Sequence, residues 1–183
     1  MGRGSSAYER ELKELLQADP ETIARYRRSV EPAQRERLDR ASRSPFLVIR
    51  AAGSLGFDLV ALRSEFAFPI EVKSSGEEVI RFSAASGRAA AQLEAHRKAV
   101  ERVGLIVLYA FRRLGGRRGD PWRLFSASAG RPGRGSLEIL RRRLPPVERT
   151  KEGNAVLRWE NGMPLLEFLE LVAFLTERPG GLA

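Results

Sequence analysis

The residues with the clearest chemical potential are two carboxylates and a lysine, Asp58, Glu71 and Lys73, in two short apolar segments. If these segments pair as a hairpin with a tight turn at Ser64 and Glu65, Asp58 lies directly opposite Glu71. The two-residue period of a strand then puts Lys73 on the face of Glu71. Two carboxylates about 4 Å apart repel by about 4 kcal/mol at a surface-like effective dielectric. This pattern predicts a cation between them, and oxygen ligands suit Mg²⁺ or Mn²⁺.

Three further features favour this interpretation over the alternative, in which the carboxylates are solvated or paired with arginines. Lys73 is one of only four lysines among the 32 basic residues. Glu9 borders the apolar stripe of a helix predicted over residues 8–17. The loop before Asp58 carries Arg50, Ser54 and two glycines, a composition suited to contact with a phosphate group.

The elements that must position these residues follow from hydrophobic periodicity. Amphipathic and Ala-rich segments predict helices, and short apolar segments between Gly, Ser or charged turns predict strands. The helices are 8–17, 86–103 and 163–177, and the strands are 46–50, 57–62, 66–73, 105–111 and 122–127. Residues 18–45 predict a helical insertion, in which Asp19 caps a helix that begins at Pro20. This order is typical of an α/β or α+β layered fold.

Composition limits the class of protein. The 183 residues include no cysteine, and no apolar run approaches the roughly 20 residues that span a bilayer. We therefore expect an intracellular, cytoplasmic protein without disulfides or a membrane segment. The net charge of +9 favours a polyanionic partner, and residues 112–143 hold ten arginines against two acidic residues. The candidate phosphate contacts there, which could also form a solvated face, are Arg117, Arg118, Arg141, Arg142 and Arg143.

Four segments in order, AYEREL (7–12), VIRAAGS (48–54), FDLVA (57–61) and IEVKS (70–74), resemble the archaeal-type Holliday junction resolvases of the PD-(D/E)xK nuclease superfamily. The likeness covers the first helix and about residues 46–128, roughly half of the chain. It implies a restriction-endonuclease-like core, with a central mixed β-sheet flanked by helices. Phe57 stands where the superfamily name has proline, and 18–45 and 129–183 have no clear counterpart in the compact family core.

The resemblance also implies roles for individual residues. Asp58 and Glu71 would be metal ligands, together with the carbonyl of Val72. Lys73 would position the attacking water or stabilise charge on the scissile phosphate, and Glu9 would complete the acidic cluster directly or through a water. The residues that would contact phosphates beside the site are Arg10, Arg50 and Ser54.

The implied activity is Mg²⁺-dependent hydrolysis of phosphodiesters in four-way DNA junctions by paired symmetrical nicks, with Mn²⁺ able to substitute. We expect a single nuclease domain over 1–183, with an insertion at 18–45 and an extension at 129–183, and no nucleotide cofactor. It would work as a nucleoid-associated homodimer on branched double-stranded DNA. The candidate dimer surfaces are 86–103, 105–111 and 163–177.

Three alternatives remain open. One is another PD-(D/E)xK endonuclease of the restriction or repair type, and another is a catalytically inactive DNA-binding module on the same fold. A basic RNA-binding or ribosome-associated protein would explain the charge but not the carboxylate pair.

For four further residues, a structural role is weighed against a functional one. His96 is expected in the core or at an interface rather than in catalysis, and Trp122 is expected in the core. Gln92 is similar to a helix glutamine that some nucleases of the superfamily use, but a lone glutamine is expected on the surface. Trp159 is balanced between the core and stacking on bases.

Overall fold

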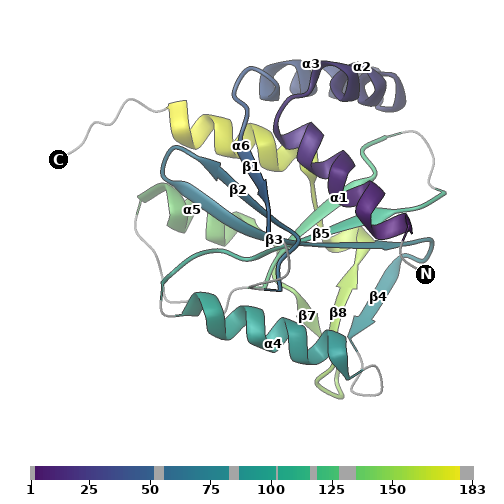
Figure 1. The fold of residues 1–183 in the computed structure, drawn as a ribbon, viewed down its shortest axis with the longest axis vertical. Helices are drawn as coiled ribbons and strands as arrows, with labels where there is room; N and C mark the ends of the chain where they lie inside the picture. Colours follow the sequence, from purple (N-terminus) through teal and green to yellow (C-terminus); the bar gives the residue numbers. More distant parts are fainter. Residues whose placement is uncertain are drawn as a thin grey trace.

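The centre of the protein is a six-stranded sheet in the order β1-β2-β3-β5-β6-β9 (Figure 1). The computed structural model describes residues 3–51, 56–82, 87–101, 103–115, 119–127 and 135–177. The strands of this sheet are β1 (Leu47–Arg50), β2 (Leu59–Arg63), β3 (Phe66–Ser75), β5 (Leu108–Arg113), β6 (Trp122–Ser126) and β9 (Met163–Pro164). The sheet is mixed, because β3 and β5 are parallel whereas the other neighbouring pairs are antiparallel.

The β2–β3 hairpin carries the acidic residues. Its strands pair in the register that the sequence predicts, and Ser64 and Glu65 form the turn. Ser64 has a φ of 49°, the left-handed conformation that tight two-residue hairpin turns require. Val72 is buried in the larger core, as predicted. Because successive side chains of a strand alternate between faces, Glu71 and Lys73 take the opposite face.

Helices cover both faces of the sheet. α1 (Arg3–Leu16) and α6 (Leu165–Glu177) lie on one side and α4 (Arg88–Glu101) on the other (Figure 1). Leu12 of α1 and Phe168 of α6 belong to one apolar core, and Leu93 of α4 belongs to a second. The predicted fold class, an α/β arrangement with a central mixed sheet flanked by helices, is confirmed.

The strand predicted over 105–111 cannot serve as a dimer surface. β5 is an interior strand, and the residues from Ile106 to Phe111 are completely buried. Its apolar run reflects burial on both faces, which the sequence does not distinguish from a contact surface.

Two short helices, α2 (Pro20–Ser29) and α3 (Pro32–Ala41), occupy the predicted insertion. The carboxylate of Asp19 accepts a hydrogen bond from the Thr22 N–H, which confirms the cap. The pair lies above α1 and α6 (Figure 1). Arg40 forms an ion pair of 2.7 Å with Glu170 of α6, which ties the insertion to the helix layer.

The last part of the chain forms α5 (Gly135–Arg143), the short 3₁₀ helix Trp159–Asn161 and two strands that join an earlier strand in a second sheet. This sheet has the order β4-β8-β7 and consists of β4 (Val79–Phe82), β8 (Ala155–Arg158) and β7 (Glu148–Arg149). None of these three strands was predicted from hydrophobic periodicity. Within the described part of the chain, none of the helices has the length and apolarity needed to cross a membrane.

Candidate active site

Asp58 lies immediately before β2, with its carboxylate directed across the hairpin. Its N–H donates to the Ile70 carbonyl at 3.0 Å, and its Oδ2 accepts from the Val72 N–H at 2.7 Å. The paired residues begin with Leu59, so Asp58 is not the cross-strand partner of Glu71, contrary to the prediction. The bond to the Val72 N–H holds the Asp58 carboxylate against the backbone of β3, one residue from Glu71.

Glu71 is a buried carboxylate with an uncompensated oxygen. The residue is 3% exposed; its Oε1 accepts from Lys73 Nζ at 2.6 Å, and its buried Oε2 has no hydrogen-bond partner. Burial raises the pKa of Glu71 to about 7, although Lys73 acts in the opposite direction. A carboxylate is costly in such a position unless a further positive charge approaches it.

Glu9 reaches the same site from α1. Its Oε2 accepts from Arg50 Nη2 at 2.7 Å, and its side chain is mostly buried. Burial raises the pKa of Asp58, the negative charge of Glu9 raises it further, and the charges of Lys73 and Arg50 lower it. The acidic residues and two cations that the sequence predicts therefore act on one another electrostatically.

Gln92 of α4 also belongs to this site, so its prediction as an ordinary surface residue is wrong. Its Oε1 accepts from Lys73 Nζ at 3.3 Å, and its Nε2 donates to the Gly56 carbonyl at 3.1 Å. Gln92 thus links the lysine to the turn that precedes Asp58. The available signal was its spacing of four residues from His96, which puts both side chains on one helix face.

His96 of α4 is a buried residue that contacts the backbone next to the site. The ring is buried, stacks on Phe57, and has Nε2 2.9 Å from the Gly56 carbonyl and Nδ1 2.9 Å from the Tyr109 hydroxyl. Because a carbonyl only accepts, Nε2 carries a hydrogen. Burial lowers the pKa of His96, which keeps the ring neutral, so the Tyr109 hydroxyl donates to Nδ1. The predicted core role of His96 is confirmed.

The donor set fits a hard divalent cation. Asp58 and Glu71 both have raised pKa values, and one oxygen of Glu71 lacks a partner. A cation beside them would offset their repulsion, and oxygen-only donors, including the Val72 carbonyl, suit Mg²⁺ or Mn²⁺. Among the described residues, no three acidic or histidine side chains converge closely enough to hold a metal. Glu9 acts on Asp58 through its negative charge, and its role in the acidic cluster, directly or through a water, stays a prediction.

The predicted phosphate contacts are dispersed. Arg10 is exposed on α1 and Arg50 is half-exposed beside Glu9. Arg141 of α5 donates to the Gly104 carbonyl, which precedes β5, whereas Lys73 pairs near the other end of that strand. The predictions for Ser54, Arg117 and Arg118 fall outside the described residues.

Arg142 and Arg143 also extend from α5 and are strongly exposed. Because α5 packs toward the start of β5, these arginines lie at the end of the sheet away from Lys73.

No protein-family model matches the chain, and no curated protein matches it. Among solved structures, the chain is similar to Hjc, a Holliday junction resolvase from the archaeal hyperthermophile Archaeoglobus fulgidus. The identity is 21%, the match covers 74% of this chain and 91% of that chain, and the TM-score is 0.46. This overlap is too loose to transfer residue roles from that protein to this chain.

Proposed function

We propose that the protein is a metal-dependent DNA endonuclease that resolves four-way junctions. The observation that carries the proposal is the buried Glu71 carboxylate, with one oxygen bonded to Lys73 and the other without a partner, beside the half-buried Asp58. Paired carboxylates with a neighbouring lysine suit phosphodiester hydrolysis, in which negative charge accumulates on the phosphate. The net charge of +9 suits a nucleic-acid substrate.

Asp58, Glu71 and the Val72 carbonyl would hold Mg²⁺. When bound, the cation would make a water more acidic and neutralise charge on the scissile phosphate. The hydrogen bond from the Val72 N–H fixes the Asp58 carboxylate, so that little reorganisation is needed. Glu9 would contribute negative charge from α1 and orient water in the site.

Lys73 supplies a positive charge beside the carboxylates. Its ammonium group is held by Glu71 and Gln92, and the side chain is 25% exposed, so it is accessible from solvent. When the substrate phosphate enters, the ammonium group would turn toward the charge that develops on it. Gln92 and the Gly56 carbonyl would limit where that group can lie.

Cleavage of three synthetic substrates with Mg²⁺ tests the proposal: a four-way junction, a matched linear duplex and a flap. We expect paired symmetrical nicks in the junction and no cleavage by the Asp58→Ala variant. Asp39→Ala is the matched control, because Asp39 is an exposed residue of α3 paired with Arg27. Equal cleavage of all three substrates would reject junction selectivity but retain the nuclease, and cleavage of none would reject both.

The proposal includes a homodimer, since a junction with two-fold symmetry requires two opposed nicks. The edge strand β1 offers an apolar contact surface. Leu47 is 61% exposed and Ile49 is 51% exposed, and they lie beside Leu62 and Val60 of β2. Analytical ultracentrifugation should show a dimer that Ile49→Lys converts to a monomer. The matched change Val103→Lys, at an exposed apolar residue elsewhere, should leave the dimer intact.

A further inference from the structure

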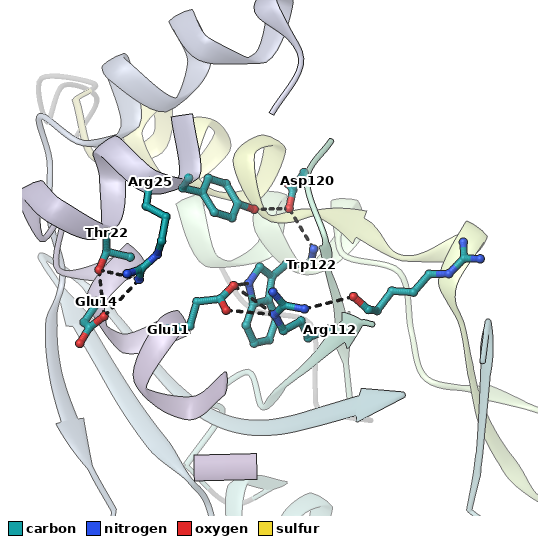
Figure 2. A network of polar contacts seen from close by, with 9 residues as sticks. Glu11, Glu14, Thr22, Arg25, Arg112, Asp120 and Trp122 are labelled. Atoms are coloured by element: carbon teal, nitrogen blue, oxygen red, sulfur yellow. Dashed lines mark hydrogen bonds and ion pairs between the residues drawn. The ribbon is translucent and has the colours of Figure 1, made fainter. Parts of the chain in front are cut away.

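A second polar site lies between the helical insertion and the central sheet. It is a cavity of about 700 Å³ lined by residues of α1, α2, the ends of β5 and β6, and the 3₁₀ helix. Its volume is in the range of small-ligand sites. Figure 2 shows polar contacts around it: Arg25 contacts Glu14 and Thr22, and Glu11 contacts Arg112 and Trp122.

The walls of this cavity are fixed by a buried carboxylate. Asp120 accepts from the Tyr26 hydroxyl at 2.6 Å, the Trp122 N–H at 3.0 Å and the Leu166 N–H at 3.0 Å. These donors come from α2, β6 and α6, so a single side chain joins the insertion to the sheet and the helix layer. A cavity between elements connected in this way keeps its shape without a ligand.

The lining of the cavity holds four arginines against three acidic residues, and two of these carboxylates, those of Glu11 and Asp120, accept hydrogen bonds within the fold. Glu11 accepts from Arg112 and from the Trp122 indole N–H, each at 3.1 Å, and Asp120 is held by the three donors described above. The Gln34 N–H donates to the backbone carbonyl of Glu31 at 2.8 Å, and the Glu31 residue is exposed. The remaining charged residues of the lining are the three arginines Arg25, Arg113 and Arg123.

Two of these arginines can engage an anion at little cost. Arg25 is 63% exposed, and its ion pair with Glu14 spans 3.9 Å. Arg113 bonds through Nη2 to the exposed Glu78, while its buried Nε has no hydrogen-bond partner. Exposed ion pairs of this kind contribute little stability, so a phosphate can replace them.

The third arginine lies over a tryptophan ring, and the two groups are called the Arg123–Trp159 platform. The guanidinium of Arg123 lies 4.3 Å from the ring centroid of Trp159, and Phe111 meets the same ring edge-on at 5.5 Å. Nucleic-acid bases stack on planar guanidinium groups and on aromatic rings. A cavity with phosphate-binding arginines and a stacking platform suits a nucleotide.

We propose that this cavity binds one unpaired nucleotide of a DNA strand, with its phosphate at Arg25 and Arg113 and its base on the Arg123–Trp159 platform. A base inside a duplex cannot enter a cavity, so the nucleotide must leave its base pair. The register of β3 and β5 pairs Lys73 with Phe111 and Ser74 with Arg112, a residue of the lining, so the cavity wall begins about 3 Å along the strands from the backbone of Lys73. The choice of DNA as the nucleotide source rests on the proposed function.

Tryptophan fluorescence in metal-free buffer tests this binding without any cleavage. The probes are thymidine monophosphate, a short oligothymidylate, a blunt duplex and inorganic phosphate. We expect the first two to quench Trp159, the oligothymidylate to bind more tightly, and the duplex and inorganic phosphate to bind far more weakly. Trp159→Phe should remove the quenching, because the other tryptophan, Trp122, is completely buried.

Matched arginine variants separate the cavity from general charge. Arg25→Gln should weaken oligothymidylate binding about tenfold, which corresponds to about 1.4 kcal/mol. Arg28→Gln on the same helix removes the same charge at an exposed position and should leave the affinity unchanged. Equal losses in the two variants, or inorganic phosphate binding as tightly as thymidine monophosphate, would overturn the proposal, as would the absence of oligothymidylate binding.

Further outcomes distinguish a DNA strand from a free nucleotide as the ligand, and failure of this proposal from failure of the proposed nuclease function. Tighter binding of thymidine monophosphate than of the oligothymidylate would identify a free nucleotide as the ligand and overturn the DNA-strand assignment. Glu77→Gln should bind oligothymidylate as the wild type does, because Glu77 is exposed and does not line the cavity. If the wild type binds oligothymidylate but cuts no DNA, the proposed nuclease function fails while the cavity assignment stands.

Discussion

The replacement Glu71→Gln should stabilise the metal-free protein at alkaline pH. Folding raises the pKa of Glu71 from an ordinary 4.5 to about 7, mainly because the side chain is buried. A carboxyl group shifted in this direction favours the folded state while it is protonated. Its contribution is complete below about pH 4.5 and is lost as the pH rises through about 7. Glutamine keeps the shape and an acceptor for Lys73 but has no charge to lose.

The size of the effect follows from the shift. At about 1.4 kcal/mol for each pH unit, the ionised Glu71 destabilises the metal-free fold by up to about 3 kcal/mol above pH 7. For a protein of 183 residues, this corresponds to about 6–12 °C in the melting temperature. Mg²⁺ should recover much of this difference in the wild type and little in the variant, because the variant lacks one carboxylate ligand.

Thermal unfolding followed by circular dichroism, at pH 5 and pH 8 with a chelator and then with Mg²⁺, measures this difference. The matched control is Glu77→Gln, at an exposed residue two positions after Ser75. Glu71→Gln should melt near the wild type at pH 5 and well above it at pH 8, while the control follows the wild type at both. A Glu71→Gln variant that melts below the wild type at pH 8 would refute the conclusion that the ionised, buried Glu71 carboxylate destabilises the metal-free fold.

Three further outcomes follow from the same geometry. Lys73→Ala should reduce the single-turnover rate of junction cleavage by a factor of about 10²–10³. The affinity for the junction in a gel-shift assay should change far less. An equally large loss of affinity would show that Lys73 acts in binding rather than in cleavage. Gly162→Ala should destabilise the fold by about 1–3 kcal/mol in urea unfolding, because a Cβ would lie 2.5 Å from Cβ of Arg123. Gly76→Ala is the control and should have no such cost, because a Cβ at Gly76 meets nothing within 4 Å. Equal stabilities of the Gly162→Ala and Gly76→Ala variants would contradict this packing. Replacing both Arg142 and Arg143 with glutamine should lower the salt slope of DNA binding by about two, whereas an unchanged slope would make them a solvated face.

The hairpin and its acidic residues were predictable because both signals are local. A strand period of two assigns Glu71 and Lys73 to one face, and a turn at Ser64 and Glu65 fixes the register of β2 against β3. Burial of the alternate face, which includes Val72, then follows. The direction of the Asp58 side chain did not follow, because it depends on a backbone bond at the point where regular pairing ends.

The second sheet and the role of Gln92 depend on contacts between distant parts of the chain. β4 and β8 each have four residues and lie more than seventy positions apart, so neither segment carries a signal of its partner. Gln92 is an ordinary residue in an Ala-rich helix until α4 packs against β3 and brings its amide to Lys73. Tertiary packing, rather than local propensity, determines both features.

The insertion shows a similar limit. Its helices were predictable from Asp19, Pro20 and Pro32, whose positions set where each helix begins. The cavity beside it was not, since Tyr26 and Asp120 are far apart in sequence and meet only in the folded protein.

The most direct test of the central claim is the single-turnover rate at which a four-way DNA junction is nicked in Mg²⁺ by the wild type, Glu71→Gln and Glu77→Gln proteins. The site described here predicts rapid nicking by the wild type and by Glu77→Gln, and a rate at least about 10² lower for Glu71→Gln. Equal rates for all three proteins, or no nicking by the wild type, would contradict the assignment of Asp58, Glu71 and Lys73 as a phosphodiester-cleaving centre.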